Sequence, residues 1–394
     1  MARRVQYLVI GGGSTGTAIA HYISLHEGRA IRLIEKGRVG WGQTGYSTAI
    51  IRLHYSNEVV ARMALTSFRV FERFEELVGG DCGFRRVGFV VAVPEDLRSG
   101  LSRNVAMLRS VGVETWEIGP EELKDLVPQV DVNGIAAAAY EPKSGFADPV
   151  STAQSFAESA RRNGAEVAEG ESVLKLVAEG GVVTRVLTNR DEYQPDVLIA
   201  ATGVWTNALF GQAGKLLPLK VLREEIGVFT RPAEFTGDHP VFADLSSDYF
   251  FYMRPHGERE TYVGSIEPFG HQECQPDDAG ATISRETFLS YHERVSRRFP
   301  AFLRSPFSPR GWTGLYDVTP DWHPIIGRDT ELKNVIWAVG LSGHGFKLAP
   351  AIGMAVRDMA LGRKPELFEE GFFSEERFLK GEPITTTYGI GVVS

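Results

Sequence analysis

The stretch Val5-Gln6-Tyr7-Leu8-Val9-Ile10-Gly11-Gly12-Gly13-Ser14-Thr15-Gly16, with Glu35 further along, decides the fold of this chain. A hydrophobic run ends in a glycine-rich turn, and a helix-like segment and a second hydrophobic run, 30–34, precede the acidic residue. A dinucleotide-binding unit requires this order of strand, glycine turn, helix, strand and acidic side chain. The sequence therefore predicts an α/β fold that binds an adenine dinucleotide.

The residues of this unit have separate predicted roles. Gly11 permits the tight turn, Gly13 lets the backbone approach a pyrophosphate, and Gly16 lets the new helix pack closely on its strand. The helix that opens at Ser14 presents free N–H groups and its positive dipole end to the phosphates, while Glu35 accepts hydrogen bonds from a ribose diol. The predicted contacts from this unit are Gly11, Gly13, Ser14, Thr15, Gly16, Glu35 and Lys36.

The composition argues against several classes of protein. The 394 residues carry a formal net charge of -8 with dispersed basic residues, which is unlike a nucleic-acid-binding protein. No apolar run reaches the length of a membrane span, and Met1 to Arg4 lead directly into the first strand without room for a cleavable signal. We therefore expect a cytoplasmic protein. Cys82 and Cys274 lie in no metal-ligand spacing, so we expect inert thiols and no metal site.

Periodicity predicts further helices and strands along the chain. Helical patterns cover about 57–77, 150–163 and 348–361, and two β-runs flank the turn Gly180-Gly181. Between about 225 and 309 the pattern alternates, as in antiparallel strands with one face in water.

These elements divide the chain into interleaved pieces, as its length allows. The dinucleotide-binding unit is expected to be discontinuous, and two insertions are expected to assemble a mixed β-sheet domain that binds the substrate. The predicted boundaries are 1–81, 148–224 and 310–394 for the first domain, and 82–147 and 225–309 for the second.

The glycine fingerprint alone fits FAD and NAD equally, because both carry the same pyrophosphate and ribose. A second glycine-rich turn, Gly340-Leu341-Ser342-Gly343-His344-Gly345-Phe346-Lys347, follows a strand predicted at 335–340. Such a turn places bare N–H groups and a helix N-terminus beside a cofactor, which suits the electron-rich end of a flavin ring. FAD is therefore favoured over NAD.

Four motifs follow one another along nearly the whole chain. They are Gly11 to Gly16 with Glu35, Ser47-Thr48-Ala49-Ile50-Ile51-Arg52, Leu198 to Gly203 with Trp205, and Gly343-His344-Gly345-Phe346-Lys347. Together they resemble the D-amino-acid oxidase superfamily, and within it the branch of sarcosine oxidase, dimethylglycine dehydrogenase and glycine oxidase. The resemblance implies a glutathione-reductase-like FAD-binding Rossmann domain with an inserted mixed β-sheet substrate domain.

The resemblance also implies roles for single residues. In that branch an arginine and a lysine that match Arg52 and Lys347 clamp the substrate carboxylate, as two converging cations can. The alternatives are a structural ion pair for Arg52 and a loop cap for Lys347. Tyr252 and Tyr316 match pocket tyrosines of that branch, although each also fits an aromatic residue of the core. His344 is expected to border the flavin, either in a structural role or as a proton acceptor. The remaining implied FAD contacts are Thr44, Ser47, Thr48, Val173, Thr202, Gly203, Trp205, Gly314, Gly343, Gly345, Phe346 and Lys347.

Two positions depart from the pattern of the monomeric sarcosine oxidases. Gly314 stands where those enzymes bond a cysteine to the flavin, so FAD is expected to be held non-covalently unless another residue attaches it. Tyr262 stands where they carry a lysine that helps reduced flavin react with oxygen. The choice between an oxidase and a dehydrogenase that uses another electron acceptor is therefore open.

The expected function is the oxidation of a small or N-methylated, sarcosine-like amino acid by hydride transfer to flavin N5, which gives an imine that hydrolyses. One alternative is a 2-hydroxy acid or glycerol-phosphate dehydrogenase, which needs a base, for which His344 is the clear candidate. Another is a flavin subunit of a heteromeric amine dehydrogenase that docks through 367–378. The sequence does not decide the natural substrate, its stereochemistry, the electron acceptor or the oligomeric state.

Overall fold

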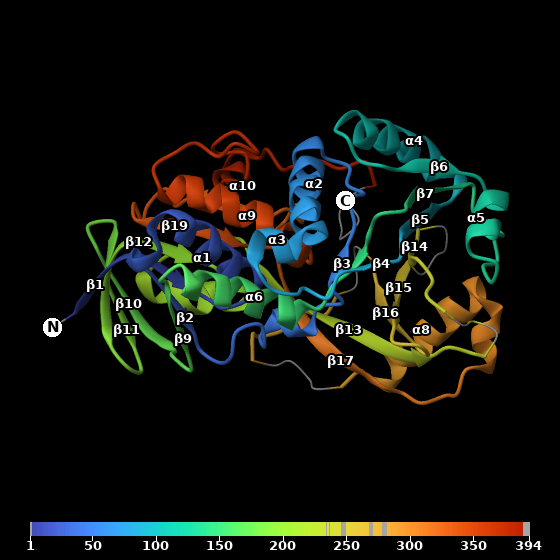
Figure 1. The fold of residues 1–394 in the computed structure, drawn as a ribbon, viewed down its shortest axis with the longest axis horizontal. Coiled ribbons are helices and arrows are strands. Elements are labelled where there is room, and N and C mark those ends of the chain that lie inside the picture. The colour runs from blue at the N-terminus through green and yellow to red at the C-terminus, as the bar shows by residue number, and fades with distance from the viewer. Residues whose placement is uncertain are drawn as a thin grey trace.

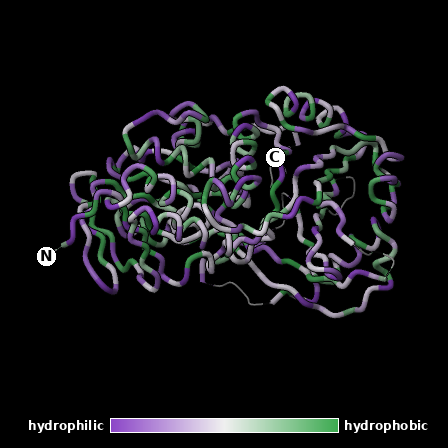
Figure 2. The backbone as a smooth tube through the Cα atoms, viewed as in Figure 1, coloured by the Kyte–Doolittle hydropathy of each residue, from purple (hydrophilic) through white to green (hydrophobic). Residues whose placement is uncertain are grey.

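The computed structural model describes residues 2–233, 235, 237–245, 250–267, 271–277 and 282–388. Figure 1 shows two lobes, each built around a β-sheet, with the chain passing between them several times. Hydrophobic segments run through the interior of both lobes, and hydrophilic segments are frequent on the outer turns (Figure 2). None of the described helices is both long enough and apolar enough to cross a membrane.

The first lobe contains a sheet whose central strands are parallel, in the order β9-β2-β1-β12-β19. The hairpin β10–β11 extends it antiparallel beside β12, and β18 pairs antiparallel with β19. Its strands are β1 (Arg3–Ile10), β2 (Ile31–Glu35), β9 (Glu166–Glu169), β10 (Val173–Glu179), β11 (Val182–Thr188), β12 (Glu192–Ala200), β18 (Ile325–Arg328) and β19 (Val335–Val339).

Helices pack against this sheet and against one another, with α1 in contact with both α6 and α9. Two of these helices begin at side-chain caps: Asn57 Oδ1 accepts a hydrogen bond from the N–H of Val59, and Asp148 Oδ1 accepts one from the N–H of Ser151. The helices of this lobe are α1 (Ser14–Glu27), α2 (Glu58–Glu72), α3 (Phe74–Val78), α6 (Pro149–Arg162), α7 (Thr206–Phe210), α9 (Gly345–Ala360) and α10 (Glu376–Lys380).

The second lobe contains a sheet in the order β17-β13-β16-β15-β14-β5-β7-β6, antiparallel except between β14 and β5. A small sheet, β3-β8-β4, is formed by β3 (Ile50–Ile51), β4 (Arg85–Arg86) and β8 (Gly145–Phe146). The other elements are β5 (Phe89–Val93), α4 (Glu95–Ser110), β6 (Trp116–Ile118), α5 (Pro120–Leu126), β7 (Ala137–Glu141), β13 (Lys220–Thr230), β14 (Val241–Asp244), β15 (Phe251–His256), β16 (Glu260–Ser265), α8 (Arg285–Arg298) and β17 (Gly311–Val318).

The two sheets draw their strands from the interleaved pieces of the chain. Strands β5 to β7 and β14 to β16 lie within 82–147 and 225–309, whereas β17 lies within 310–394 and still pairs with β13 in the second sheet. The predicted domain boundaries stay a prediction.

The antiparallel strands predicted within 225–309 are present as β13, β15 and β16, but two details of the prediction were wrong. The stretch 225–309 contains the helix α8 as well as antiparallel strands, because Phe288, Tyr291 and Val295 form a buried helical stripe. Strand β15 has no wet face, since Phe251 to Pro255 are all buried. The helix α4 was not predicted.

The segment 367–378 packs on its own lobe. Phe368 and Phe373 are buried with ring centroids 4.9 Å apart, and both belong to the core that includes α1 and α9. Arg377 is also buried and binds both carboxylate oxygens of Asp321, at 2.8 and 2.9 Å. Two of its aromatic rings are therefore already covered, and the role of this segment as a docking surface stays a prediction.

The Arg377–Asp321 pair gives a stability prediction. Arg377→Met leaves the Asp321 carboxylate buried without its partner, and we expect the free energy of unfolding to fall by about 3–5 kcal/mol. Chemical denaturation measures this change. Lys380→Met, which removes an exposed ion pair with Glu376, is the control and should leave the stability nearly unchanged. An equally small loss for Arg377→Met would show that the pair does not hold this segment.

Candidate active site

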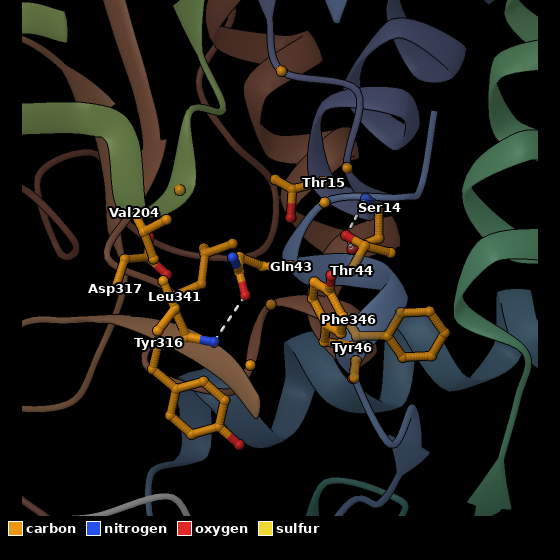
Figure 3. A pocket seen from close by; sticks show the side chains of 18 of the residues that line it. Ser14, Thr15, Gln43, Thr44, Tyr46, Val204, Tyr316, Asp317, Leu341 and Phe346 are labelled. Atoms are coloured by element: carbon orange, nitrogen blue, oxygen red, sulfur yellow. Dashed lines mark hydrogen bonds between the residues drawn. The ribbon is translucent and has the colours of Figure 1, made fainter. Parts of the chain in front are cut away.

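A cavity of about 480 Å³ lies between the glycine turn after β1 and the sheet of the second lobe. Figure 3 shows that Ser14, Thr15 and Thr44 lie on one side of it and Tyr316 and Asp317 on another. The structure brings nearly every predicted site residue to its wall, namely Gly11, Gly13, Ser14, Thr15, Gly16, Glu35, Lys36, Thr44, Ser47, Thr48, Arg52, Val173, Thr202, Gly203, Trp205, Tyr252, Gly314, Tyr316, Gly343, Gly345, Phe346 and Lys347.

The glycine turn has no room for side chains. Gly11 has φ +110°, and a Cβ there would lie 2.2 Å from the carbonyl oxygen of Ala201. A Cβ on Gly16 would lie 1.9 Å from the carbonyl oxygen of Gly11. Because both contacts are with backbone atoms, only glycine allows β1, the turn and α1 to approach so closely.

The acidic residue after β2 lies beside the turn, as predicted. The Glu35 carboxylate accepts hydrogen bonds from the N–H groups of Gly12 and Gly37, both at 2.7 Å. Each carboxylate oxygen can accept more than one hydrogen bond, so Glu35 retains capacity for a diol. The Lys36 Nζ lies 3.4 Å from the ring centroid of Trp205, and burial lowers the pKa of this amine. Glycine backbone, diol acceptor and cavity together fit a dinucleotide.

One detail of the predicted phosphate site differs. The N–H of Ser14 donates to Thr44 Oγ1 at 3.0 Å (Figure 3), so this group of the first turn of α1 is not free. Thr44 also lines the cavity and carries a hydroxyl hydrogen that it can donate in turn. The expectation of free N–H groups was therefore wrong for Ser14, because a loop side chain caps the helix.

Two buried cations face the cavity. The Arg52 guanidinium lies 4.2 Å from the ring centroid of Tyr55 and donates to the carbonyl of His54, and Lys347 Nζ donates to the carbonyl of Gly343 at 3.1 Å. Burial and the charge of Arg52 hold the pKa of Lys347 well below its usual range. An anion bound between Arg52 and Lys347 would offset the cost of burying the two charges and their mutual repulsion. The arrangement therefore fits a carboxylate ligand.

Two tyrosines also form part of the cavity wall. The hydroxyl of Tyr252 lies 3.3 Å from Thr48 Oγ1, and burial raises the pKa of Tyr252 and of Tyr316 above 10. Tyr316 packs against the loop before α9, where a Cβ on Gly343 would lie 2.8 Å from its ring. Both phenols are therefore neutral groups that can donate or accept a hydrogen bond.

His344 is the one proposed catalytic residue that the structure does not place in the cavity wall. Its ring is buried, 5.5 Å from the ring of Tyr55 and 6.3 Å from that of His323. Neither ring nitrogen has a hydrogen-bond partner within the described part of the chain. Burial and the neighbouring charge of Lys347 hold the pKa of His344 well below 6.5, so the ring is a neutral packing group here.

Sequence reasoning missed several polar residues of the wall. Gln43 Oε1 accepts a hydrogen bond from the N–H of Leu315 at 2.8 Å, which ties the loop before β3 to β17 (Figure 3). Asp317 accepts one from Gly340 at 2.6 Å, and burial raises the pKa of Asp317 to about 6. Glu224 is a buried acid in the same wall. No local motif marks these residues, because long-range strand pairing brings them to the cavity.

The chain matches known proteins over most of its length. A model of the family described as FAD dependent oxidoreductase (DAO) matches residues 6–359. The 4-methylaminobutanoate oxidase (formaldehyde-forming) of Paenarthrobacter nicotinovorans is 27% identical over 383 residues, which cover 95% of this chain and 46% of that enzyme. This chain therefore spans about half the length of that relative. Sarcosine oxidase subunit beta of Rhodobacter capsulatus is 27% identical over 401 residues, covering 99% of this chain and 92% of that subunit.

Solved structures share the same architecture. The L-proline dehydrogenase from P. horikoshii has a TM-score of 0.85 and 26% identity, covering 98% of this chain and all of that one. The glycine oxidase from Geobacillus kaustophilus has a TM-score of 0.79 at 20% identity, which shows a shared fold. The predicted family, its mixed α/β fold and FAD as cofactor are thereby confirmed. This chain belongs to the FAD dependent oxidoreductase (DAO) family.

Proposed function

We propose that this protein oxidises a small primary or secondary amino acid, including N-methylated ones, with FAD held non-covalently. The observation that carries the proposal is the pair of buried cations, Arg52 and Lys347, in the same cavity as the dinucleotide turn. A carboxylate bound by both would have a fixed orientation relative to the cofactor, and orientation is a large part of the rate enhancement that such an enzyme requires.

The named relatives support this class of substrate. By name, one acts on 4-methylaminobutanoate, one is a subunit that acts on sarcosine and one acts on L-proline. Each of these compounds combines a carboxylate with an amine. We therefore propose amino acids as the class of substrate for this protein, without naming one compound.

The residues of the cavity have distinct roles in the proposed reaction. When bound, FAD supplies the acceptor for the hydride that leaves the carbon next to nitrogen. Arg52 and Lys347 bind the carboxylate, and Tyr252 and Tyr316 form a wall that limits the size of the substrate. Both clamp side chains are buried, which shields them from water and so strengthens their electrostatic hold on a carboxylate.

The reaction of the reduced flavin with oxygen depends on residues other than the carboxylate clamp. Tyr262 is stacked on His256 with ring centroids 4.3 Å apart, and it does not line the cavity. Among the described residues that line the cavity the lysines are Lys36, which lies on the ring of Trp205, and Lys347 of the clamp, so the wall offers no further lysine to favour the reaction with oxygen. We propose a dehydrogenase that reacts slowly with oxygen.

An anaerobic screen tests the proposed function. The holoenzyme is mixed without oxygen with sarcosine, L-proline, glycine, D-alanine, 4-methylaminobutanoate, 2-hydroxyglutarate and glycerol 3-phosphate, and the visible absorbance of the flavin is recorded. We expect at least one amino acid to bleach the flavin and slow recovery after air is admitted. Bleaching by 2-hydroxyglutarate or glycerol 3-phosphate alone would contradict the proposal.

A further inference from the structure

Glu224 places a carboxylate in the wall of the cavity that already contains two cations. Along β13 the side chains alternate, so that Glu224 and Ile226 line the cavity while Glu225 accepts a hydrogen bond from the N–H of Ser284 on the other face. Glu224 is only 6% exposed, and its register partner on β17 is Gly314, which also lines the cavity.

The Glu224 carboxylate has one close ionic partner, the imidazole of His271. His271 Nδ1 lies 2.7 Å from Oε1, while the other ring nitrogen of His271 lies 2.6 Å from the carbonyl oxygen of Glu267. His271 is therefore at ion-pair distance from Oε1, although among the described residues no donor is aligned on Oε1 as a regular hydrogen bond requires. Burial raises the pKa of Glu224, and although burial alone would lower the pKa of His271, the carboxylate raises it.

A buried carboxylate with a single ionic partner is costly to maintain, since buried charges require opposite charges and hydrogen bonds. Tyr252 and Tyr316 are close enough to Glu224 for its charge to raise the pKa values of their phenols, although burial is the larger cause. The cavity thus offers cations at Arg52 and Lys347 and an acceptor of N–H groups at Glu224. This polarity is complementary to a zwitterion.

We propose that Glu224 binds the ammonium group of the substrate while Arg52 and Lys347 bind its carboxylate. This inference rests on the proposed function and narrows the substrates to amino acids that bind as zwitterions. A 2-hydroxy acid or a glycerol phosphate would bring a second anion beside Glu224 with no ammonium group to offset the repulsion, so the same residue disfavours them.

The test compares amino acids with isosteres that lack the positive charge. L-Proline is paired with tetrahydro-2-furoate, and sarcosine with (methylthio)acetate. Binding is measured by anaerobic titration calorimetry on the chemically pre-reduced holoenzyme, in which no turnover occurs. For Glu224→Gln we expect the Kd of the amino acids to rise about 100-fold and that of the isosteres to change by less than about 3-fold.

Two further variants complete the design. Glu224→Asp keeps the charge and should retain much of the preference for the amino acid, which guards against a loss caused by misfolding. Glu225→Gln makes the same change on the opposite face of β13 and should leave both Kd values as in the wild type.

The outcomes separate this inference from the proposed function. If L-proline or sarcosine reduces the wild-type flavin but Glu224→Gln keeps the wild-type Kd, the role of Glu224 is wrong and the proposed function stands. Equal losses for the amino acid and its isostere would also overturn the role of Glu224. If no amino acid in the anaerobic screen reduces the wild-type flavin, the proposed function itself fails.

Discussion

Lys347→Met is expected to raise the Kd of a carboxylated substrate about 100-fold, while FAD remains bound. The loss corresponds to about 3 kcal/mol, which is typical of removing one partner from a buried, hydrogen-bonded charge pair. Methionine fills a similar volume, so the cavity should keep its shape. The measurement is the substrate dependence of anaerobic flavin reduction, with flavin content determined on the same sample.

The pH dependence of binding gives this prediction a second readout. Burial and Arg52 depress the pKa of Lys347, so a bound carboxylate should restore its charge and take up a proton. The affinity for (methylthio)acetate, which has no amine to titrate, should therefore fall as the pH rises through the pKa of Lys347 in the free enzyme. Lys347→Met should lose this pH dependence.

Lys364→Met serves as the matched control for Lys347→Met. Lys364 is exposed beyond the end of α9, and its replacement should leave both binding and its pH profile unchanged. If Lys347→Met behaves like Lys364→Met, Lys347 is a loop cap and not part of the clamp.

Gly11→Ala is expected to abolish FAD binding. The new Cβ would lie 2.2 Å from a backbone oxygen, at a residue whose φ of +110° already disfavours a side chain, so β1 and α1 would have to separate. We expect a loss of about 3 kcal/mol or more in the free energy of unfolding. Flavin absorbance per chain and chemical denaturation measure the two effects.

Gly362→Ala isolates the cost of the backbone conformation. Gly362 also has a positive φ, +72°, but a Cβ there would meet no atom within 4 Å. We expect FAD binding to be retained and the stability to fall by about 1 kcal/mol. A similar result for Gly11→Ala would mean that the close approach at the turn is not needed for the cofactor.

Sequence motifs predicted the residues on the cofactor side of the cavity, because short stretches of sequence determine the backbone conformation there. The glycines, Glu35 and the turn before α9 act through backbone geometry that neighbouring residues determine. For the same reason, the helices that begin after Asn57 and Asp148 could be predicted from their capping residues.

The substrate side could not be predicted in this way. In the stretch Arg223-Glu224-Glu225-Ile226 either glutamate could face the cavity, and the pairing of β13 with the distant strand β17 decides between them. The direction of the His344 ring likewise depends on its packing against Tyr55 and His323. The helix α4 could have been found, because Leu101, Val105 and Leu108 are buried at helical spacing.

The amount of FAD that the purified chain binds tests the account most directly. We predict a yellow protein with one FAD per chain, and full release of the flavin on denaturation, because Gly314 provides no side chain for a covalent bond. Addition of (methylthio)acetate should then perturb the flavin spectrum in the wild type and not in Lys347→Met at the same concentration. A colourless protein that takes up no FAD on reconstitution, or a flavin spectrum that no carboxylate changes, would contradict the account.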